Sequence, residues 1–478
     1  MKLVYKMNER PPFAKNLVYA FQQLLAIIAA TVLVPALVNN SLPATSPTQP
    51  MSQAAALIGA GVGTLVYLLF TRFKSPVFLG SSFAFISPLC TGILYGYCGI
   101  ILGSVFAGLV YVVIALVIRR VGSGWISKLM PPVIIGPTVA LIGLSLSGSA
   151  ISNVMNTTGE YNLLGILVAI VTFLVTVLVS VKGNKSMKLI PFVIGVGAGY
   201  ALALVLTLLG MAFGSDYMKL IDFTAFESIA DFSNWIPKLS FVEAIKELTG
   251  SVGTTNTFDF TAVLNIFVAF APVALVVFAE HVADHKNISS IIDQDLLENP
   301  GLDKTLLGDG VGSMAGAFFG GCPNTTYGES IGCVAITGNA SVYTIFTTAI
   351  MCIVLAFIYP VMLFIESIPA CVVGGICIAL YGFIAVSGLR MFKNVDLDDS
   401  KNLFIVAAIL VAGLGGLELK IGPVTISSIA CALILGIVVN LLLKPHNVKV
   451  TKEVETDGLT EEETMFGTVY EEKKDENK

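Results

Sequence analysis

The chain has 478 residues, of which 55% are hydrophobic and only 12% are charged, and its formal net charge is −5. Its mean hydropathy of +0.85 excludes an ordinary soluble domain of this size. The composition therefore predicts an all-α polytopic membrane protein.

About fourteen segments are apolar enough to cross a bilayer, for which a helix needs roughly 20 apolar residues. In chain order they are 16–38, 52–71, 78–95, 98–118, 127–148, 163–181, 189–211, 260–279, 304–320, 324–337, 342–365, 370–388, 402–417 and 424–443. The third and tenth segments contain glycine, proline and hydroxyl residues that resist a continuous helix. We therefore expect short extended segments to break spans 3 and 10.

The basic residues predict how these spans are oriented. With the N-terminus inside, 23 of the 27 lysines and arginines fall on the cytoplasmic side, where such residues are in excess. Both termini are therefore expected in the cytoplasm, and residues 1–12 show no cleavable signal peptide. The segments outside the spans are then a cytoplasmic N-terminus at 1–15, an extracellular loop at 212–259 and a cytoplasmic disordered tail at 444–478.

Two similar polar stretches suggest an internal repeat. Gly80-Ser-Ser-Phe-Ala-Phe85 and Asn324-Thr-Thr-Tyr-Gly-Glu329 each lie in the third span of their half of the chain. Seven spans per half would make the repeats inverted, which is a common plan of secondary transporters. The repeats are 16–211 and 260–443. Their extended segments would meet near the midplane, each followed by a half-helix whose free N–H groups point into a binding site.

The carboxylates in apolar segments are candidate functional residues, because an ionisable group in hydrocarbon is costly unless it is paired or hydrated. One is Glu329. A second cluster is Ala279-Glu-His-Val-Ala-Asp-His285, in which Glu280 and Asp284 share a helical face while His281 and His285 form the adjacent one. Three interpretations compete: a cytoplasmic helix end in water, a metal site, and proton coupling through a buried carboxylate. The order of residues is not the HExxH of zinc hydrolases, so we expect no metal.

Glu280 and Glu329 together indicate the chemistry of a ligand. Carboxylates accept hydrogen bonds from N–H groups, and helix N-termini donate to carbonyl oxygens. A small, flat, neutral molecule that alternates N–H and C=O would satisfy both, and a nucleobase fits. Phe83 and Tyr327 either offer aromatic surface to a flat ring or serve only as packing residues.

At this point the sequence resembles the nucleobase–ascorbate transporter family, and within it the bacterial uracil permeases. The likeness runs from Phe21–Pro35 through Leu79–Pro88 and Ala279–His285 to Pro323-Asn-Thr-Thr-Tyr-Gly-Glu329. The resemblance implies a fold of fourteen spans, with a core domain from spans 1–4 and 8–11 and a gate domain from spans 5–7 and 12–14. It also implies proton-coupled uracil import across the plasma membrane by an elevator-like movement of core against gate, in a homodimer.

The resemblance also assigns roles to residues. Glu280 and Glu329 would bind the pyrimidine, the backbone amides of Phe83 and Gly328 would donate to it, and Tyr327 would lie beside it. Glu280 would carry the proton, with Asp284 and His285 as further candidates for coupling. No cofactor, enzymatic activity or nucleic-acid partner is expected.

The chain departs from the family pattern at three places. Gln22-Gln23 stands where the first span often has Gln-His, and Asp284 stands where some uracil permeases have a histidine. The usual asparagine of the signature is Ser330. The alternatives that remain are a purine or xanthine permease of the same fold, an intramembrane metal-dependent enzyme, and a channel or sensor.

Overall fold

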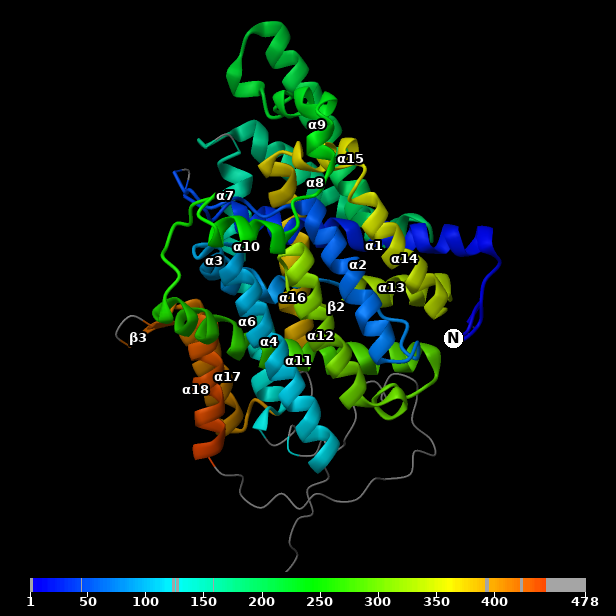
Figure 1. Cartoon of the computed structure of the whole chain (residues 1–478), viewed down its shortest axis with the longest axis vertical. Coiled ribbons are helices and arrows are strands. Elements are labelled where there is room, and N and C mark those ends of the chain that lie inside the picture. Colours follow the sequence, from blue (N-terminus) through cyan, green and yellow to red (C-terminus); the bar gives the residue numbers. More distant parts are fainter. Residues whose placement is uncertain are drawn as a thin grey trace, which may run out of the picture.

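The computed structural model describes residues 3–43, 45–122, 125, 129–157, 159–391, 395–421 and 424–443. This part of the chain is mostly helical, with two small two-stranded sheets (Figure 1). The predicted tail at 444–478 lies outside the described residues.

The first half of the chain forms nine described α-helices, together with shorter 3-10 helices and one strand. Its elements are α1 (Phe13–Asn39), α2 (Gln53–Phe70), β1 (Leu79–Ser81), η1 (Phe83–Phe85), α3 (Ile86–Ile93), α4 (Gly96–Val121), α6 (Pro132–Ser145), α7 (Ser147–Met155), α8 (Leu163–Lys182), η2 (Met187–Leu189), α9 (Pro191–Phe213), η3 (Asp216–Met218), η4 (Thr224–Ala230), η5 (Phe232–Trp235) and α10 (Ser240–Leu248).

The second half holds the other three strands. Its elements are α11 (Phe260–Ile292), η6 (Leu297–Gly301), α12 (Leu302–Gly320), β2 (Asn324–Thr326), α13 (Gly328–Thr337), α14 (Val342–Leu355), α15 (Tyr359–Glu366), α16 (Ala370–Met391), α17 (Ser400–Leu414), β3 (Leu419–Ile421), β4 (Val424–Ile426) and α18 (Ser428–Leu442).

Three helical segments differ from the sequence-based expectation. α11 is 33 residues long and continues well past residue 279, to Ile292. α14 and α15 are bent by 82° at a short break rather than forming one straight helix. The segment at 424–443 begins as the strand β4, which pairs with β3, and becomes helical only at Ser428.

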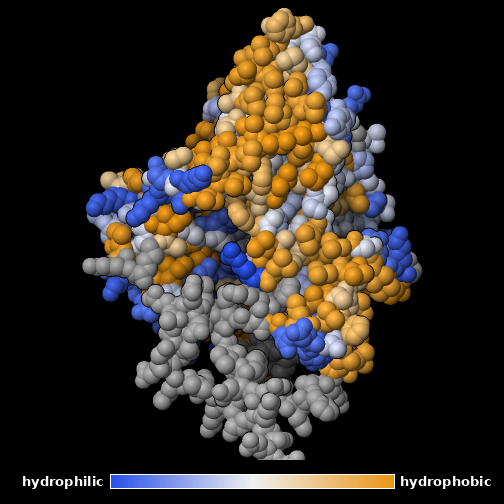
Figure 2. Space-filling view, turned by 180° about the vertical axis from the view of Figure 1, so that it is seen from behind, coloured by the Kyte–Doolittle hydropathy of each residue, from blue (hydrophilic) through white to orange (hydrophobic). Residues whose placement is uncertain are grey.

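Within the described residues, eight helices are long and apolar enough to cross a membrane, or nine if α14 and α15 count as one bent span. The surface agrees with this, because one face of the molecule is largely covered by hydrophobic residues (Figure 2). Exposed apolar side chains include those of Leu167, Val181 and Phe213. The number of fourteen spans stays a prediction.

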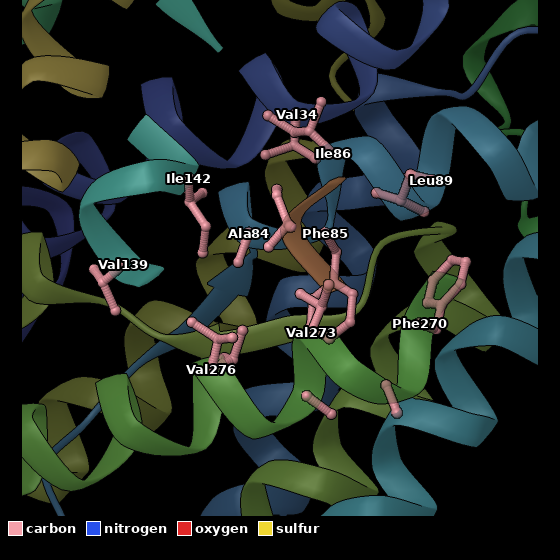
Figure 3. Packing of buried hydrophobic residues seen from close by; sticks show 14 of the residues in the cluster. Val34, Ala84, Phe85, Ile86, Leu89, Val139, Ile142, Phe270, Val273 and Val276 are labelled. Atoms are coloured by element: carbon pink, nitrogen blue, oxygen red, sulfur yellow. The ribbon is translucent and has the colours of Figure 1, made fainter. Parts of the chain in front are cut away.

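The centre of the molecule is a set of packed helices. α12 lies against α2 and α4, and α11 packs on α4 (Figure 1). α16 packs separately against α6 and α8, and α17 packs against α18. Buried apolar residues join these groups where α1, α3, α6 and α11 meet, including Phe85 and Phe270, whose rings stack at 5.8 Å (Figure 3).

The contact between α2 and α12 depends on glycine. A Cβ atom on Gly59 would lie 2.9 Å from the Cα atom of Gly320 and would overlap the carbonyl oxygen of Gly316. The two backbones therefore touch, which is the small-residue packing that brings membrane helices close together.

The segment at 212–259 is held at both ends. In its first part, the Tyr217 hydroxyl accepts from the Leu163 N–H at 2.8 Å, which ties the segment to α8. In its later part, the Glu247 carboxylate accepts from the N–H groups of Tyr97 and Cys98 at 2.9 and 3.2 Å. Glu247 thereby satisfies free donors at the start of α4, and burial raises the pKa of this carboxyl above its ordinary value.

We expect Gly59→Ala to destabilise the fold by about 1–3 kcal/mol, because the added methyl group forces α2 and α12 apart. Gly197→Ala in α9 is the matched control, since a Cβ there would have no neighbour within 4 Å. Melting temperatures of the purified proteins measure the difference. Equal melting temperatures for both variants and the parent protein would contradict the close contact.

Candidate functional site

The site is built around the pairing of β1 with β2, which lie about half a chain apart in sequence. The strands are antiparallel, with Leu79 opposite Thr326, Gly80 opposite Thr325 and Ser81 opposite Asn324. Two further backbone bonds extend the pairing, from the Ser82 N–H to the Pro323 carbonyl and from the Tyr327 N–H to the Phe78 carbonyl. The two polar stretches that the sequence singled out are therefore joined to each other.

Side chains of α2 and β2 fix this pair against the helices. The Thr64 hydroxyl donates to the Leu79 carbonyl at 3.1 Å and accepts from the Leu79 N–H at 2.9 Å. The Asn324 amide donates to the Gly59 carbonyl at 2.8 Å. Asn324 lies where Cβ atoms on Gly63 and Gly316 would stand, so glycine at both positions makes room for it.

The N-terminus of α13 opens onto free space. The helix begins at Gly328, and its N-cap residue Tyr327 makes no side-chain capping bond. Gly328 is exposed, and a Cβ on either Gly328 or Gly332 would have no neighbour within 4 Å. The first N–H groups of a helix have no partner within it, so this opening presents donors to a ligand.

Three carboxylates surround the opening. Glu329 lies in the first turn of α13, while Glu280 and Asp284 lie on α11, and all three are only partly exposed. Glu280 is close enough to Asp284 and Glu329 to interact with both electrostatically. Asp284 accepts a hydrogen bond from the Thr326 hydroxyl at 2.6 Å, which attaches α11 to β2.

The two aromatic candidates lie in different surroundings. Phe83 is partly buried, and its ring centroid is 6.4 Å from that of Tyr381 on α16, in an edge-on arrangement. Tyr327 is buried against Gly80, and its hydroxyl donates to the Ser81 carbonyl at 2.7 Å. Tyr327 therefore supports the strand pair, and contact of either ring with a ligand stays a prediction.

The two histidines of the α11 cluster point into the protein and are fully buried. His281 Nδ1 lies 2.7 Å from Asp309 Oδ2, and His285 Nε2 lies 2.7 Å from the Tyr67 hydroxyl. The interpretation of this cluster as a helix end in water is wrong for His285, because its side chain is fully buried. It fits Lys286, which is exposed.

These positions argue against the metal-site alternative. Glu280 and Asp284 face the opening, whereas the histidines on the adjacent face already bind Asp309, Thr305 and Tyr67. In the part of the chain that the structure describes, no three His, Cys, Asp or Glu side chains are grouped so that they could hold a metal ion.

Sequence reasoning missed two features of the site. Asp309 was not singled out from the sequence, although an acid within an apolar segment is a functional candidate by the same argument as Glu280. Gln23, which stands where the family often has histidine, donates to the carbonyl and hydroxyl oxygens of Ser330. Gln23 and Ser330, two of the positions at which the chain departs from the family pattern, thus contact each other.

Comparison with known proteins identifies the family. Residues 14–421 match the model of the Permease family (Xan_ur_permease). The chain is 36% identical to a uracil permease of Bacillus caldolyticus over 92% of this chain and 95% of the relative. It is 34% identical to the uracil permease of Escherichia coli K12 over 94% of this chain and 96% of the relative.

The chain resembles solved structures in its fold alone. The chain resembles SLC26A9 with a TM-score of 0.58 and 11% identity, over 90% of this chain and 64% of that one. It also resembles the transmembrane domain of a cyanobacterial bicarbonate transporter, BicA, with a TM-score of 0.55 and 13% identity, over 91% of this chain and 100% of that one.

The relatives are named permeases, which are transporters and not enzymes. Together with the apolar helices, the match over nearly the whole chain leads to one conclusion: the chain is a multi-pass membrane protein that belongs to the Permease family.

Proposed function

We propose that the protein is a proton-coupled symporter that imports uracil across the plasma membrane. The observation that carries the proposal is the opening at Gly328, where free helix N–H groups lie beside the carboxylates of Glu280 and Glu329. The relatives named uracil permease support the choice of substrate.

Uracil matches the donors and acceptors of this opening. Its ring N–H groups would donate to Glu280 and Glu329, and its carbonyl oxygens would accept from the backbone amides of Gly328 and Phe83. An inorganic anion would be repelled by the same carboxylates. Phe83 and Tyr327 would lie beside the flat ring.

Glu280 is the proposed proton carrier. It lies close to Asp284 and Glu329, and no lysine or arginine forms an ion pair with any of the three among the described residues. Neutralisation by a proton relieves their mutual repulsion, so loading Glu280 would favour binding of a neutral substrate. Asp284 and His285 are further members of the proposed coupling site.

The proposed architecture has fourteen spans in two inverted repeats, with spans 3 and 10 broken at β1 and β2. The antiparallel pairing of the strands, each followed by a helix, supports this symmetry. The core domain would comprise α1–α4 and α11–α15, and the gate domain α6–α9 and α16–α18. The separate packing of α16 with α6 and α8 supports this division.

Transport would proceed by an elevator-like movement of core against gate. The site residues Phe83, Glu280 and Glu329 all lie on core elements, and Tyr381 faces Phe83 from the gate. The excess of basic residues on one side supports a cytoplasmic location of both termini and an extracellular 212–259 segment. A homodimer rests on the family resemblance.

A purine or xanthine permease is the second candidate, because those bases also alternate N–H and C=O. The name of the matching family model, Xan_ur_permease, supports this candidate. The same uptake experiment separates it from the first.

Purified protein in liposomes should accumulate labelled uracil when an inward proton gradient is imposed without sodium. Unlabelled uracil should block the uptake, and xanthine should not. Block by xanthine instead would favour the second candidate, and uptake that only equilibrates across the membrane would indicate a channel.

Glu280→Gln should abolish proton-driven accumulation while uracil exchange between the two sides continues, because the amide still accepts a hydrogen bond but cannot carry a proton. Glu329→Gln should weaken binding about 10- to 100-fold through loss of a charge-assisted hydrogen bond. Glu298→Gln, at an exposed position, is the matched control. Normal accumulation by Glu280→Gln would refute its role as proton carrier.

Gly328→Ala should leave the melting temperature unchanged, since its Cβ would enter open space, but should weaken uracil binding at least tenfold by filling the opening. Calorimetric titration with uracil measures the affinity, with Gly197→Ala as control. Unchanged affinity would place the substrate elsewhere.

A further inference from the structure

A fully buried contact between a histidine and a carboxyl group joins α11 to α12 outside the proposed uracil site. His281 Nδ1 lies 2.7 Å from Asp309 Oδ2, and His281 Nε2 lies 3.1 Å from the Thr305 hydroxyl. All three side chains are completely buried. The pair therefore has no access to bulk water in this conformation.

Counting donors shows how many protons the pair holds. The Thr305 hydroxyl lies 3.2 Å from the Leu302 carbonyl, and in the arrangement in which it donates there it accepts from His281 Nε2, which then carries a hydrogen. The short Nδ1–Oδ2 contact needs a second hydrogen, on the ring or on the carboxyl group. In either arrangement the His281–Asp309 pair holds one dissociable proton and is neutral overall.

Loss of that proton has a defined consequence. The one hydrogen that stays on the His281 ring would then lie on Nδ1 and be donated to an ionised Asp309, and Nε2 would become an acceptor. The Thr305 hydroxyl would turn from the Leu302 carbonyl to Nε2. One proton leaves the pair for the solvent that reaches the partly exposed Glu280, no hydrogen bond of the ring is lost, and the pair becomes negatively charged.

A negative pair would face other acidic groups. Glu280 precedes His281 on α11 and interacts electrostatically with Asp309, as does Asp284. The remaining titratable groups around the pair are His285 on α11, Tyr67 on α2 and Tyr111 on α4. The second carboxylate oxygen of Asp309 has no hydrogen-bond partner among the described residues. Among the residues that the structure describes, no lysine or arginine forms an ion pair with Asp309, so the proton of the pair and the charge of Glu280 depend on each other.

We propose that His281 and Asp309 form a second proton-binding site of the transport cycle, which exchanges its proton when the charge of Glu280 changes. The inference rests on the proposed function, because it requires that uracil binding be linked to protons at Glu280. His281 and Asp309 do not touch the substrate, and they act through Glu280.

The test counts protons taken up or released when uracil binds to purified protein in a weakly buffered solution, across a range of pH. The parent protein should show two inflections in this profile, one for Glu280 and one for the pair. Asp309→Asn keeps the size of the side chain and an acceptor for His281, and should remove one inflection. Asp303→Asn, on the same helix but outside the cluster, should keep both.

One further variant and two possible contrary results make the outcome decisive. The double variant His281→Gln/Asp309→Asn should match Asp309→Asn, because both lack the same proton site, and it replaces the single variant if that one does not fold. An inflection that is shifted but not lost would overturn the inference, since it would mean that Asp309 only perturbs Glu280 by its charge. A parent protein that binds uracil without any proton exchange would instead refute proton coupling itself.

Discussion

The constraint on which the structure depends is that backbone polar groups in apolar surroundings must find partners within the protein. Two short segments leave the helical conformation here, at Leu79–Ser81 and Asn324–Thr326, and each satisfies its backbone groups with the other. The pairing holds together two stretches about half a chain apart and leaves the following helix N-termini free of side-chain caps. The two strands pair with each other and do not use the first N–H groups of the helices that follow them. Those N–H groups are therefore the donors of the candidate site.

Glycine makes this arrangement possible at two levels. Gly59, Gly316 and Gly320 let α2 and α12 touch, and Gly63 and Gly316 leave the space that the Asn324 side chain occupies where it anchors β2. At the opening, a Cβ atom on Gly328 or Gly332 would have no neighbour within 4 Å, so these glycines border open space. Glycine therefore allows the close contact of α2 with α12 and also leaves open space at the N-terminus of α13.

Helix α11 carries two acids on one face and packs with the adjacent face against a third acid, which belongs to α12. Glu280 and Asp284 border the opening, where partial exposure lets a substrate or a proton reach them. His281 lies on the adjacent face and contacts the buried Asp309 of α12. Because a buried charge without a partner is costly, a histidine next to Glu280 in sequence links the chemistry of the site to the packing of α11 on α12.

The apolar segments, the two polar interruptions and the candidates Glu280 and Glu329 could be predicted from the sequence, because hydropathy and helix-breaking residues act locally. The sequence also indicated the family through contiguous motifs. Only the tertiary structure decided the strand register, the partner of His281 and the burial of His285, which depend on residues distant in the chain. Periodicity placed Glu280 and His281 on different faces, but no local pattern could say that one face meets open space and the other meets Asp309.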